Sequence, residues 1–158
     1  MAGHDAAADS FWRFSLMVYS RPGVADALLR LQDRAGHNVN LVLFAMWLGL
    51  IQRRRLDAAD LSRATAAIAD LSRDVVEPLR QLRRALKENP AADIRALRRR
   101  VLALEIDAER RVQARLAASI AGRKTRSSDG PRIAEANLRL VLGVDASSEE
   151  ALILRGLP

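Results

Sequence analysis

The segment from Asn38 to Ile51 restricts the possible folds more than any other part of the sequence. It reads NVNLVLFAMWLGLI, and after Val39 only Asn40 and Gly49 interrupt the apolar residues. A helix that is apolar on every side has to be buried on every side. The run is also too short to cross a bilayer, which takes roughly 20 residues. It therefore predicts a central core helix against which the other helices pack.

The composition indicates a globular all-α protein. The chain has 158 residues, of which 49% are apolar and 28% charged, a size that suits one domain with a sizeable core. Ala, Leu and Arg dominate and all favour helices, whereas aromatic residues make up only 4%. Without cysteine, the chain has no disulfide, thiolate metal site or thiol nucleophile. It shows neither a secretory signal pattern nor a transmembrane run, so we expect a cytoplasmic protein.

Helix start and stop signals divide residues 9–55 into an apolar N-terminal core of three helices. Asp9 or Ser10 is expected to cap the first helix through a free backbone N–H of its first turn. Pro22 ends that helix because proline cannot continue the hydrogen-bond ladder. The second helix is predicted over residues 24–35. Two further signals bound the central helix, namely Gly36 at the preceding helix end and Asn38 as its cap.

Residues 57–121 predict a long basic hairpin of two antiparallel helices. Asp57 or Asp60 is expected to cap the first arm, in which Pro78 should produce a kink. A turn at Asn89-Pro90 then leads to a second arm over about 92–121. Beyond a loop at 122–130, residues 131–157 predict two short C-terminal helices, the first closed by Gly143. The whole chain is thus expected to form a bundle of about six or seven helices, with a projecting or docked hairpin.

The N-terminal third carries a recognisable signature. Its elements are Phe11-Trp12, Phe14-Ser15-Leu16, Tyr19, Pro22-Gly23-Val24, Leu31-Gln32-Asp33, Gly36, Val39-Asn40-Leu41, Phe44 and Trp47-Leu48. In these residues the chain resembles a family of uncharacterised proteobacterial proteins, a domain of unknown function. The resemblance implies no activity, substrate or cofactor, so it assigns no residue a functional role.

A polar set lies between two apolar helices and has two interpretations. It consists of Gln32, Asp33, His37, Asn38 and Asn40. One interpretation is a small binding or catalytic pocket in which Asp33 orients His37. The other, which we favour, is structural: Asp33 and Asn38 cap helix ends, while Gln32 and Asn40 bond to the backbone of the turn at residues 21–24. A cavity with convergent polar groups would support the pocket.

The aromatic residues of the N-terminal half also allow two interpretations. They could line a ligand site, which makes Trp12 and Tyr19 candidate binding residues. Large aromatics between helices more often form the core, and this is the interpretation that we favour. The tyrosine hydroxyl and the two indole N–H groups would then need hydrogen-bond partners, which the polar set could supply.

The net charge of +7 is concentrated in the middle of the chain. Residues 53–126 contain 19 Lys and Arg against 10 Asp and Glu. Such a surface could contact the phosphates of RNA or the ribosome, but the hairpin has no aromatic residue for base stacking. Alternatively, it is a solvated face with ion pairs such as Glu77–Arg80 and Asp107–Arg111. The candidate polyanion contacts are Arg80, Arg83, Arg84, Lys87, Arg95, Arg98 and Arg99.

The sequence contains no recognisable catalytic or metal-binding motif. Glu105, Asp107 and Glu109 lack the Glu-x-x-His partners of a di-iron bundle, because neither His4 nor His37 follows a glutamate at that spacing. We therefore expect no metal, no cofactor and no enzymatic activity. The leading hypothesis is a cytoplasmic protein-interaction module that uses the hairpin. Binding of RNA or the ribosome surface, and a small-molecule or catalytic pocket at Gln32, Asp33, His37 and Asn40, are the alternatives.

Overall fold

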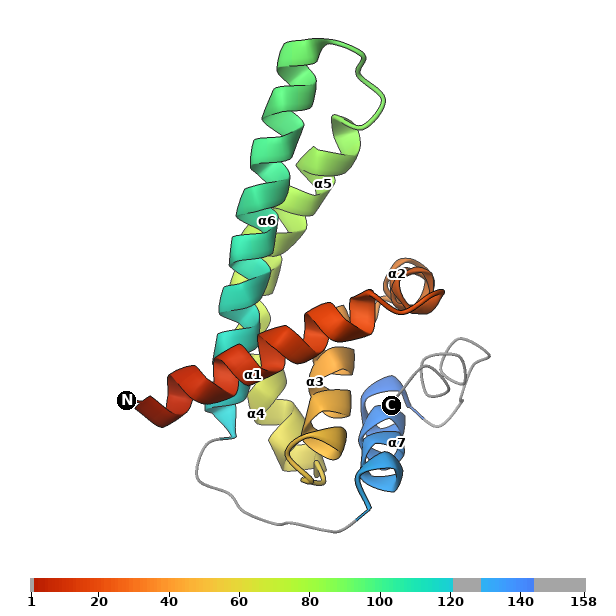
Figure 1. The fold of residues 1–158 in the computed structure, drawn as a ribbon, viewed down its shortest axis with the longest axis vertical. Helices are drawn as coiled ribbons and strands as arrows, with labels where there is room; N and C mark the ends of the chain where they lie inside the picture. Colours follow the sequence, from red (N-terminus) through yellow and green to blue (C-terminus); the bar gives the residue numbers. More distant parts are fainter. Residues whose placement is uncertain (1, 121–128, 144–158) are drawn as a thin grey trace.

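The computed structural model describes residues 2–120 and 129–143, which form helices and their connections without a strand. The helices are α1 (Ala2–Tyr19), α2 (Val24–Ala35), α3 (Val39–Leu50), α4 (Ala58–Leu71), the π-helical turn η1 (Ser72–Val76), α5 (Glu77–Ala85), α6 (Ala92–Ser119) and α7 (Gly130–Leu142). Because α4, η1 and α5 follow one another without a break, these elements make six helical rods (Figure 1). The prediction of an all-α bundle of about six or seven helices is confirmed.

Helix α3 is the centre of the fold. All twelve of its residues are buried, as its continuous apolar sequence requires. Helices α1, α2, α6 and α7 all contact it, so its apolar surface faces protein on every side. Trp47 stacks with Phe11 of α1 and with Phe44, with ring centroids 5.1 and 6.1 Å apart, and the Phe11 ring is tilted against that of Phe44. The predicted central core helix is therefore present in the structure.

Two residues hold α7 against α3. A Cβ atom at Gly49 would lie 2.3 Å from the Cα atom of Ala134, so the two backbones approach closely only because position 49 is glycine. The amide of Asn137 is fully buried; its Oδ1 accepts from the N–H of Leu56 at 2.8 Å. Its Nδ2 donates to the carbonyls of Ala45 and Arg54. These bonds join α7 to α3 and to the connection that follows α3.

Several predicted helix ends are confirmed. Gly36 closes α2 in the left-handed conformation, with φ of 67°. Asn38 caps α3 by accepting from the N–H of Asn40 at 3.0 Å. Asp57 caps α4, and Asp60 completes a reciprocal capping box by accepting from the N–H of Asp57.

The predicted cap of the first helix is wrong. Helix α1 begins at Ala2, so Asp9 and Ser10 lie inside it. The alanines at positions 6–8 are strong helix formers, and they allow the helix to continue upstream of the polar residues. The two side chains make tertiary contacts instead: Ser10 Oγ accepts from the Trp47 indole N–H at 3.3 Å, and Asp9 pairs with Arg110.

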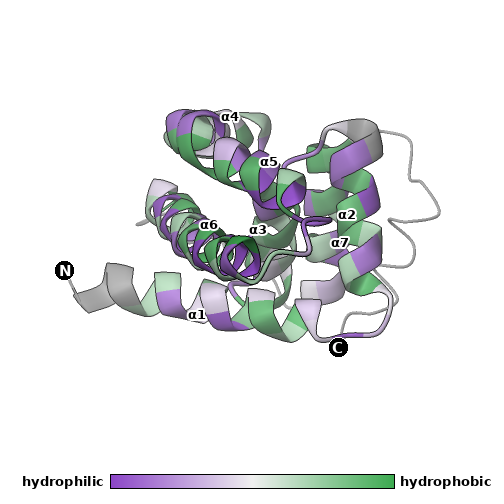
Figure 2. Ribbon diagram, turned by 90° about the horizontal axis from the view of Figure 1, so that it is seen from above, coloured by the Kyte–Doolittle hydropathy of each residue, from purple (hydrophilic) through white to green (hydrophobic). Residues whose placement is uncertain are grey.

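The predicted hairpin consists of the α4–η1–α5 rod and the 28-residue helix α6. In Figure 1 its upper part, α5 and the first turns of α6, extends away from the rest of the molecule. The lower part is docked: Figure 2 shows α6 lying between α1 and the α4–α5 rod, both of which it contacts. The hairpin therefore both packs on the core and projects from it.

Where the sequence predicts a kink at Pro78, the structure has the π-helical turn η1 directly before α5. Pro78 has no N–H to donate to the carbonyl four residues before it, so the ladder is interrupted there in any case. In the preceding turn the N–H of Glu77 bonds to the carbonyl of Ser72, which is five residues away. The deviation therefore lies one turn upstream of the proline.

Helix α7 starts as the sequence indicates, with Pro131 in its first turn and Asp129 Oδ1 accepting from the N–H of Arg132. Gly143 follows its last residue with φ of 87°. The predicted loop at 122–130 falls largely outside the described residues, and the predicted last helix falls outside them entirely. Within the described part, no helix is both long and apolar enough to span a membrane.

Candidate functional site

A pocket of about 510 Å³ lies where the turn between α2 and α3 faces η1 and α5. All five residues of the predicted polar set line it, namely Gln32, Asp33, His37, Asn38 and Asn40. The opposite wall comes from the hairpin. It includes Ser72, Arg73, Glu77, Arg80 and Arg84.

The polar set does not form the capping arrangement that we favoured, except at Asn38. Asp33 forms an ion pair with Arg84 at 2.8 Å instead of capping a helix. Asn40 Oδ1 accepts from the Nε2 group of Gln113, at 3.0 Å, instead of bonding to the turn at residues 21–24. Gln113 Oε1 in turn accepts from Ser15 Oγ. A buried chain of hydrogen bonds thus connects the pocket to α6 and α1.

The hairpin residues of the pocket could not be found from local sequence. Arg84 and Asp33 are 51 positions apart in the chain, and no sequence motif at either residue predicts their contact. Arg80 was predicted as a polyanion contact or as an ion-pair partner of Glu77 on a solvated face, yet its side chain is 14% exposed. Arg80 is therefore part of the junction between the core and the hairpin, and Arg84, whose side chain is 46% exposed, pairs with Asp33 at the edge of that junction.

Behind the pocket, two arginines of α5 meet two glutamates of α6. Arg80 contacts both Glu105 and Glu109, at 3.4 and 2.8 Å, and also pairs with Glu77 on its own helix. Arg83 donates two hydrogen bonds to Glu105, which is buried. The two ion pairs predicted on this surface, Glu77–Arg80 and Asp107–Arg111, are both present. The cluster holds the two arms of the hairpin together by charge-assisted hydrogen bonds.

The surroundings of this cluster raise the pKa of one of its members, Glu109, and of the adjacent Tyr19. Burial raises the pKa of Glu109, while the ion pair with Arg80 opposes that shift. Burial of the hydroxyl and the negative charge of Glu109 raise the pKa of Tyr19 well above 10. Tyr19 as a whole residue is nevertheless 39% exposed, so it lies at the edge of the cluster with its hydroxyl protonated at neutral pH.

The raised pKa of Glu109 predicts a specific pH dependence of stability. The folded protein binds the Glu109 proton more tightly than the unfolded chain, so stability falls as pH rises from the unfolded value of 4.5 through the folded one. Glu109→Gln removes this contribution. We expect the unfolding free energy of the wild type, relative to that of this variant, to decrease between about pH 4 and 8 in urea titrations. A relative stability that rises with pH would contradict the assignment; Glu88→Gln, at an exposed carboxylate, is the control.

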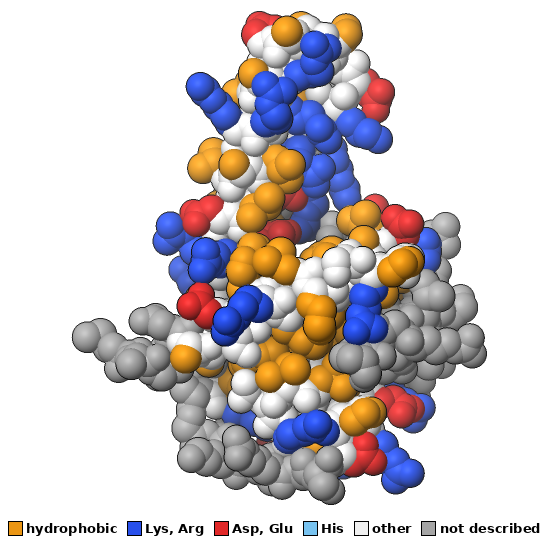
Figure 3. Space-filling view, viewed as in Figure 1, with side chains coloured by type: hydrophobic (Ala, Val, Ile, Leu, Met, Phe, Trp, Pro, Cys, Tyr) orange, Lys and Arg blue, Asp and Glu red, His pale blue; other side chains and the backbone are white. Residues whose placement is uncertain are grey.

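The outer face of the hairpin carries an apolar groove of about 470 Å³. Its floor is formed by Leu71, Val75, Pro78, Leu79, Leu82, Leu104 and Ala108. Among these, Leu104 is 58% exposed and Leu82 is 46% exposed. Asp107 and Arg111, which pair with each other, lie on its rim. Figure 3 shows hydrophobic side chains gathered at mid-height on the hairpin, with basic side chains above them.

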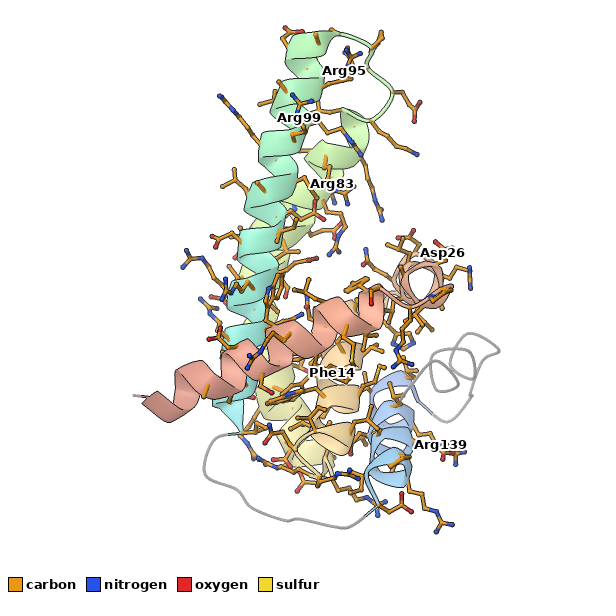
Figure 4. All side chains as sticks on the ribbon, in the orientation of Figure 1. Phe14, Asp26, Arg83, Arg95, Arg99 and Arg139 are labelled. Atoms are coloured by element: carbon orange, nitrogen blue, oxygen red, sulfur yellow. The ribbon has the colours of Figure 1, made fainter. Side chains whose placement is uncertain are left out.

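The tip of the hairpin has a strong excess of positive charge. Residues 80–100 contain eight basic and two acidic residues. The net charge of this segment is therefore close to the net charge of +7 of the whole chain. Arg83 and Arg84 are neutralised by carboxylates, whereas Arg95 and Arg98 donate only to backbone carbonyls. Lys87 is 3.8 Å from Glu88, and Arg99 makes no ion pair within the part of the chain that the structure describes. The labelled side chains of Arg95 and Arg99 lie near this end of α6 in Figure 4.

The remaining aromatic candidates separate into core and surface residues. Phe11, Phe14, Phe44 and Trp47 are buried, which agrees with the core interpretation. Trp12 is half-buried, and the guanidinium of Arg110 lies over its ring at 5.9 Å from the centroid. Neither Trp12 nor Tyr19 lines the pocket between the α2–α3 turn and α5. Over residues 2–120 and 129–143, no group of three or more His, Asp and Glu side chains is placed to hold a metal ion.

Comparison with known proteins gives a family and no activity. The profile of a family described as a protein of unknown function, DUF2390, matches residues 10–116. This range includes α2, α3, the first arm of the hairpin, all but the last three residues of α6 and every residue of the pocket. No curated protein and no solved structure matches the chain. The match covers more than half of the sequence, and the chain therefore belongs to the DUF2390 family of proteins of unknown function.

Proposed function

We propose that this protein is a protein-interaction module whose hairpin binds an amphipathic helix of a partner. The supporting observation is the apolar groove between the α4–η1–α5 rod and α6. Two packed helices leave a continuous groove along their shared face. A partner helix that packs its apolar stripe into this groove completes a three-helix arrangement. Exposed leucines in such a groove lose their contact with water when it is filled, which favours association.

The charge beside the groove specifies the partner further. Along α6, Leu104, Arg100 and Leu97 follow one another at helical spacing toward the tip, so basic and apolar residues share one face. Arg99 and Arg100 form no ion pair with any residue in the described ranges. A partner helix that carries acidic residues at the end lying over the tip would pair with these guanidinium groups. The proposed partner segment is therefore acidic at one end and apolar along one face.

The same features favour a protein partner over RNA. Arg80, Arg83 and Arg84 were candidates for phosphate contact, but all three bind carboxylates of this chain. The hairpin presents leucines rather than aromatic rings, and single-stranded RNA recognition relies on stacking. An apolar groove gives no advantage in binding a phosphate backbone.

Affinity capture with groove variants tests the proposal. Leu82→Glu places a carboxylate in the groove, and Leu29→Glu is a matched control because both leucines are 46% exposed. Such surface changes alter stability by only about 0.5 kcal/mol, so both variants should fold, which circular dichroism verifies. We expect the wild type and Leu29→Glu to retain the same protein from a cell lysate at moderate salt. The affinity of Leu82→Glu for this protein should be lower by a factor of at least about ten, which is a loss of about 1.4 kcal/mol in binding free energy.

The captured segment is then identified by cross-linking, and it should be an acidic amphipathic helix attached to the groove. Equal retention by Leu82→Glu and Leu29→Glu would overturn the proposal, as would the absence of any enriched protein. If retention instead depends on RNA and is abolished by ribonuclease, the hairpin is an RNA-binding surface.

A further inference from the structure

We infer that the pocket between the α2–α3 turn and the hairpin binds a small organic anion, through a carboxylate or phosphate group. This site is separate from the outer groove: the pocket is lined by residues of α2, α3, α4, η1 and α5, and it shares no lining residue with the groove. Its volume of about 510 Å³ lies within the range of about 300–1,000 Å³ that small-molecule sites occupy. An ion such as phosphate alone would leave most of it unfilled.

The side chain of Asn40 is the first argument for a ligand. It lines the pocket, although the residue is only 6% exposed. Its Oδ1 accepts from Gln113 Nε2, which orients the amide. Its Nδ2 group donates to no residue among those that the structure describes. A buried donor without an acceptor costs roughly 1–3 kcal/mol, and an oxygen atom of a ligand in the pocket would satisfy it.

The charges around the pocket are the second argument. Three arginines line it, Arg73, Arg80 and Arg84, against the carboxylates of Asp33 and Glu77. Arg84 donates to Asp33 through Nη2, so its Nε and Nη1 groups remain for another acceptor. The wall also includes the N-terminal residues of α3, a 12-residue helix whose dipole is positive at this end. Arg73 pairs with Asp74, and Arg80 pairs with Glu77, Glu105 and Glu109. The donors that remain for an oxyanion are therefore the other guanidinium nitrogens of Arg84 and the amide of Asn40.

The local backbone is the third observation. Ser72, Arg73 and Val76 belong to the π-helical turn η1, and all three line the pocket. A π-helical turn is less stable than a regular helix and is frequent at functional sites. Here it lies opposite the α2–α3 turn, so two segments that depart from regular helix face each other across one cavity.

Nuclear magnetic resonance titration of the full chain tests this inference. The probes are citrate, adenosine monophosphate and inorganic phosphate, each added to about 10 mM at constant ionic strength. Citrate and the nucleotide distinguish a carboxylate from a phosphate ligand, and inorganic phosphate separates an adventitious anion site from one that needs an organic body. We expect saturable amide shifts at residues 36–40 and 72–77 with at least one of the two organic anions.

Two arginine variants make the result specific. Arg84→Ala removes a guanidinium from the pocket wall, while Arg99→Ala removes one from the hairpin tip, outside the pocket. Affinity for the bound anion should fall at least about tenfold in Arg84→Ala and stay within about twofold in Arg99→Ala. The inference is wrong if neither organic anion produces saturable shifts, or if Arg84→Ala binds as tightly as the wild type. Shifts confined to residues 95–100 would equally refute it, because they would report general attraction to the basic tip.

Discussion

Gly49→Ala is expected to destabilise the protein by about 3 kcal/mol and to lower its melting temperature by about 10 °C. The added Cβ would lie 2.3 Å from both the Cα and the backbone nitrogen of Ala134. Backbone atoms cannot rotate away from the contact, so α7 has to move off α3 and lose apolar contacts along its length. The better helix propensity of alanine returns only about 1 kcal/mol. Thermal and urea unfolding followed by circular dichroism measure the effect.

Two further variants identify the cause. Adding Ala134→Gly should fail to restore stability, because the closest atoms belong to the backbone of residue 134. Gly36→Ala is the control for glycine replacement, since nothing lies within 4 Å of its added Cβ. We expect that variant to lose only about 1 kcal/mol, from the positive φ at that position. A Gly49→Ala protein as stable as the wild type would show that α7 does not pack as closely as the structure indicates.

Asn137→Leu is expected to have the second large effect, a loss of about 3–5 kcal/mol. The asparagine is completely buried and makes three hydrogen bonds to the backbone, at 2.8, 3.0 and 3.2 Å. Leucine has the same branching and a larger volume, so no cavity forms, but the N–H of Leu56 and the carbonyl of Arg54 lose their partner. Each buried polar group left unpaired costs roughly 1–3 kcal/mol.

Denaturant titration of Asn137→Leu checks this, with Gln81→Leu as the exposed amide control. Gln81 is on the outside of α5, and its replacement should change stability by no more than about 0.5 kcal/mol. Hydrogen exchange should show faster exchange at the N–H of Leu56 and across α7 in Asn137→Leu. A loss below about 1 kcal/mol would mean that water replaces the side-chain amide and that this part of the core is solvated.

The sequence predicted most helix boundaries because their causes are local. Gly36, Asn38 and Asp57 act through conformation or hydrogen bonds within a few residues, and each ends or begins a helix as expected. The cap predicted at Asp9 or Ser10 failed for a physical reason as well. A polar side chain favours a helix start only if the residues before it do not themselves favour helix, and three alanines precede these two.

The candidate site was only half visible in the sequence. Gln32, Asp33, His37 and Asn40 are close together in the chain, so their proximity could be predicted, although a structural role was preferred for them. Their partners Arg84 and Gln113 are 51 and 73 positions away from Asp33 and Asn40. No periodicity or spacing connects such pairs, because their distance depends on how α5 and α6 dock against the core.

The linear chain was thus sufficient for the all-α class, the buried central helix and the two-armed basic segment, because helical periodicity and capping depend on near neighbours. Docking of the hairpin determined the rest. It joined five polar residues of the α2–α3 region to arginines of α5 in a single pocket, and it left the outer leucines of the hairpin uncovered. Which apolar and charged residues remain accessible depends on contacts between distant segments, and these contacts form only when the helices pack together.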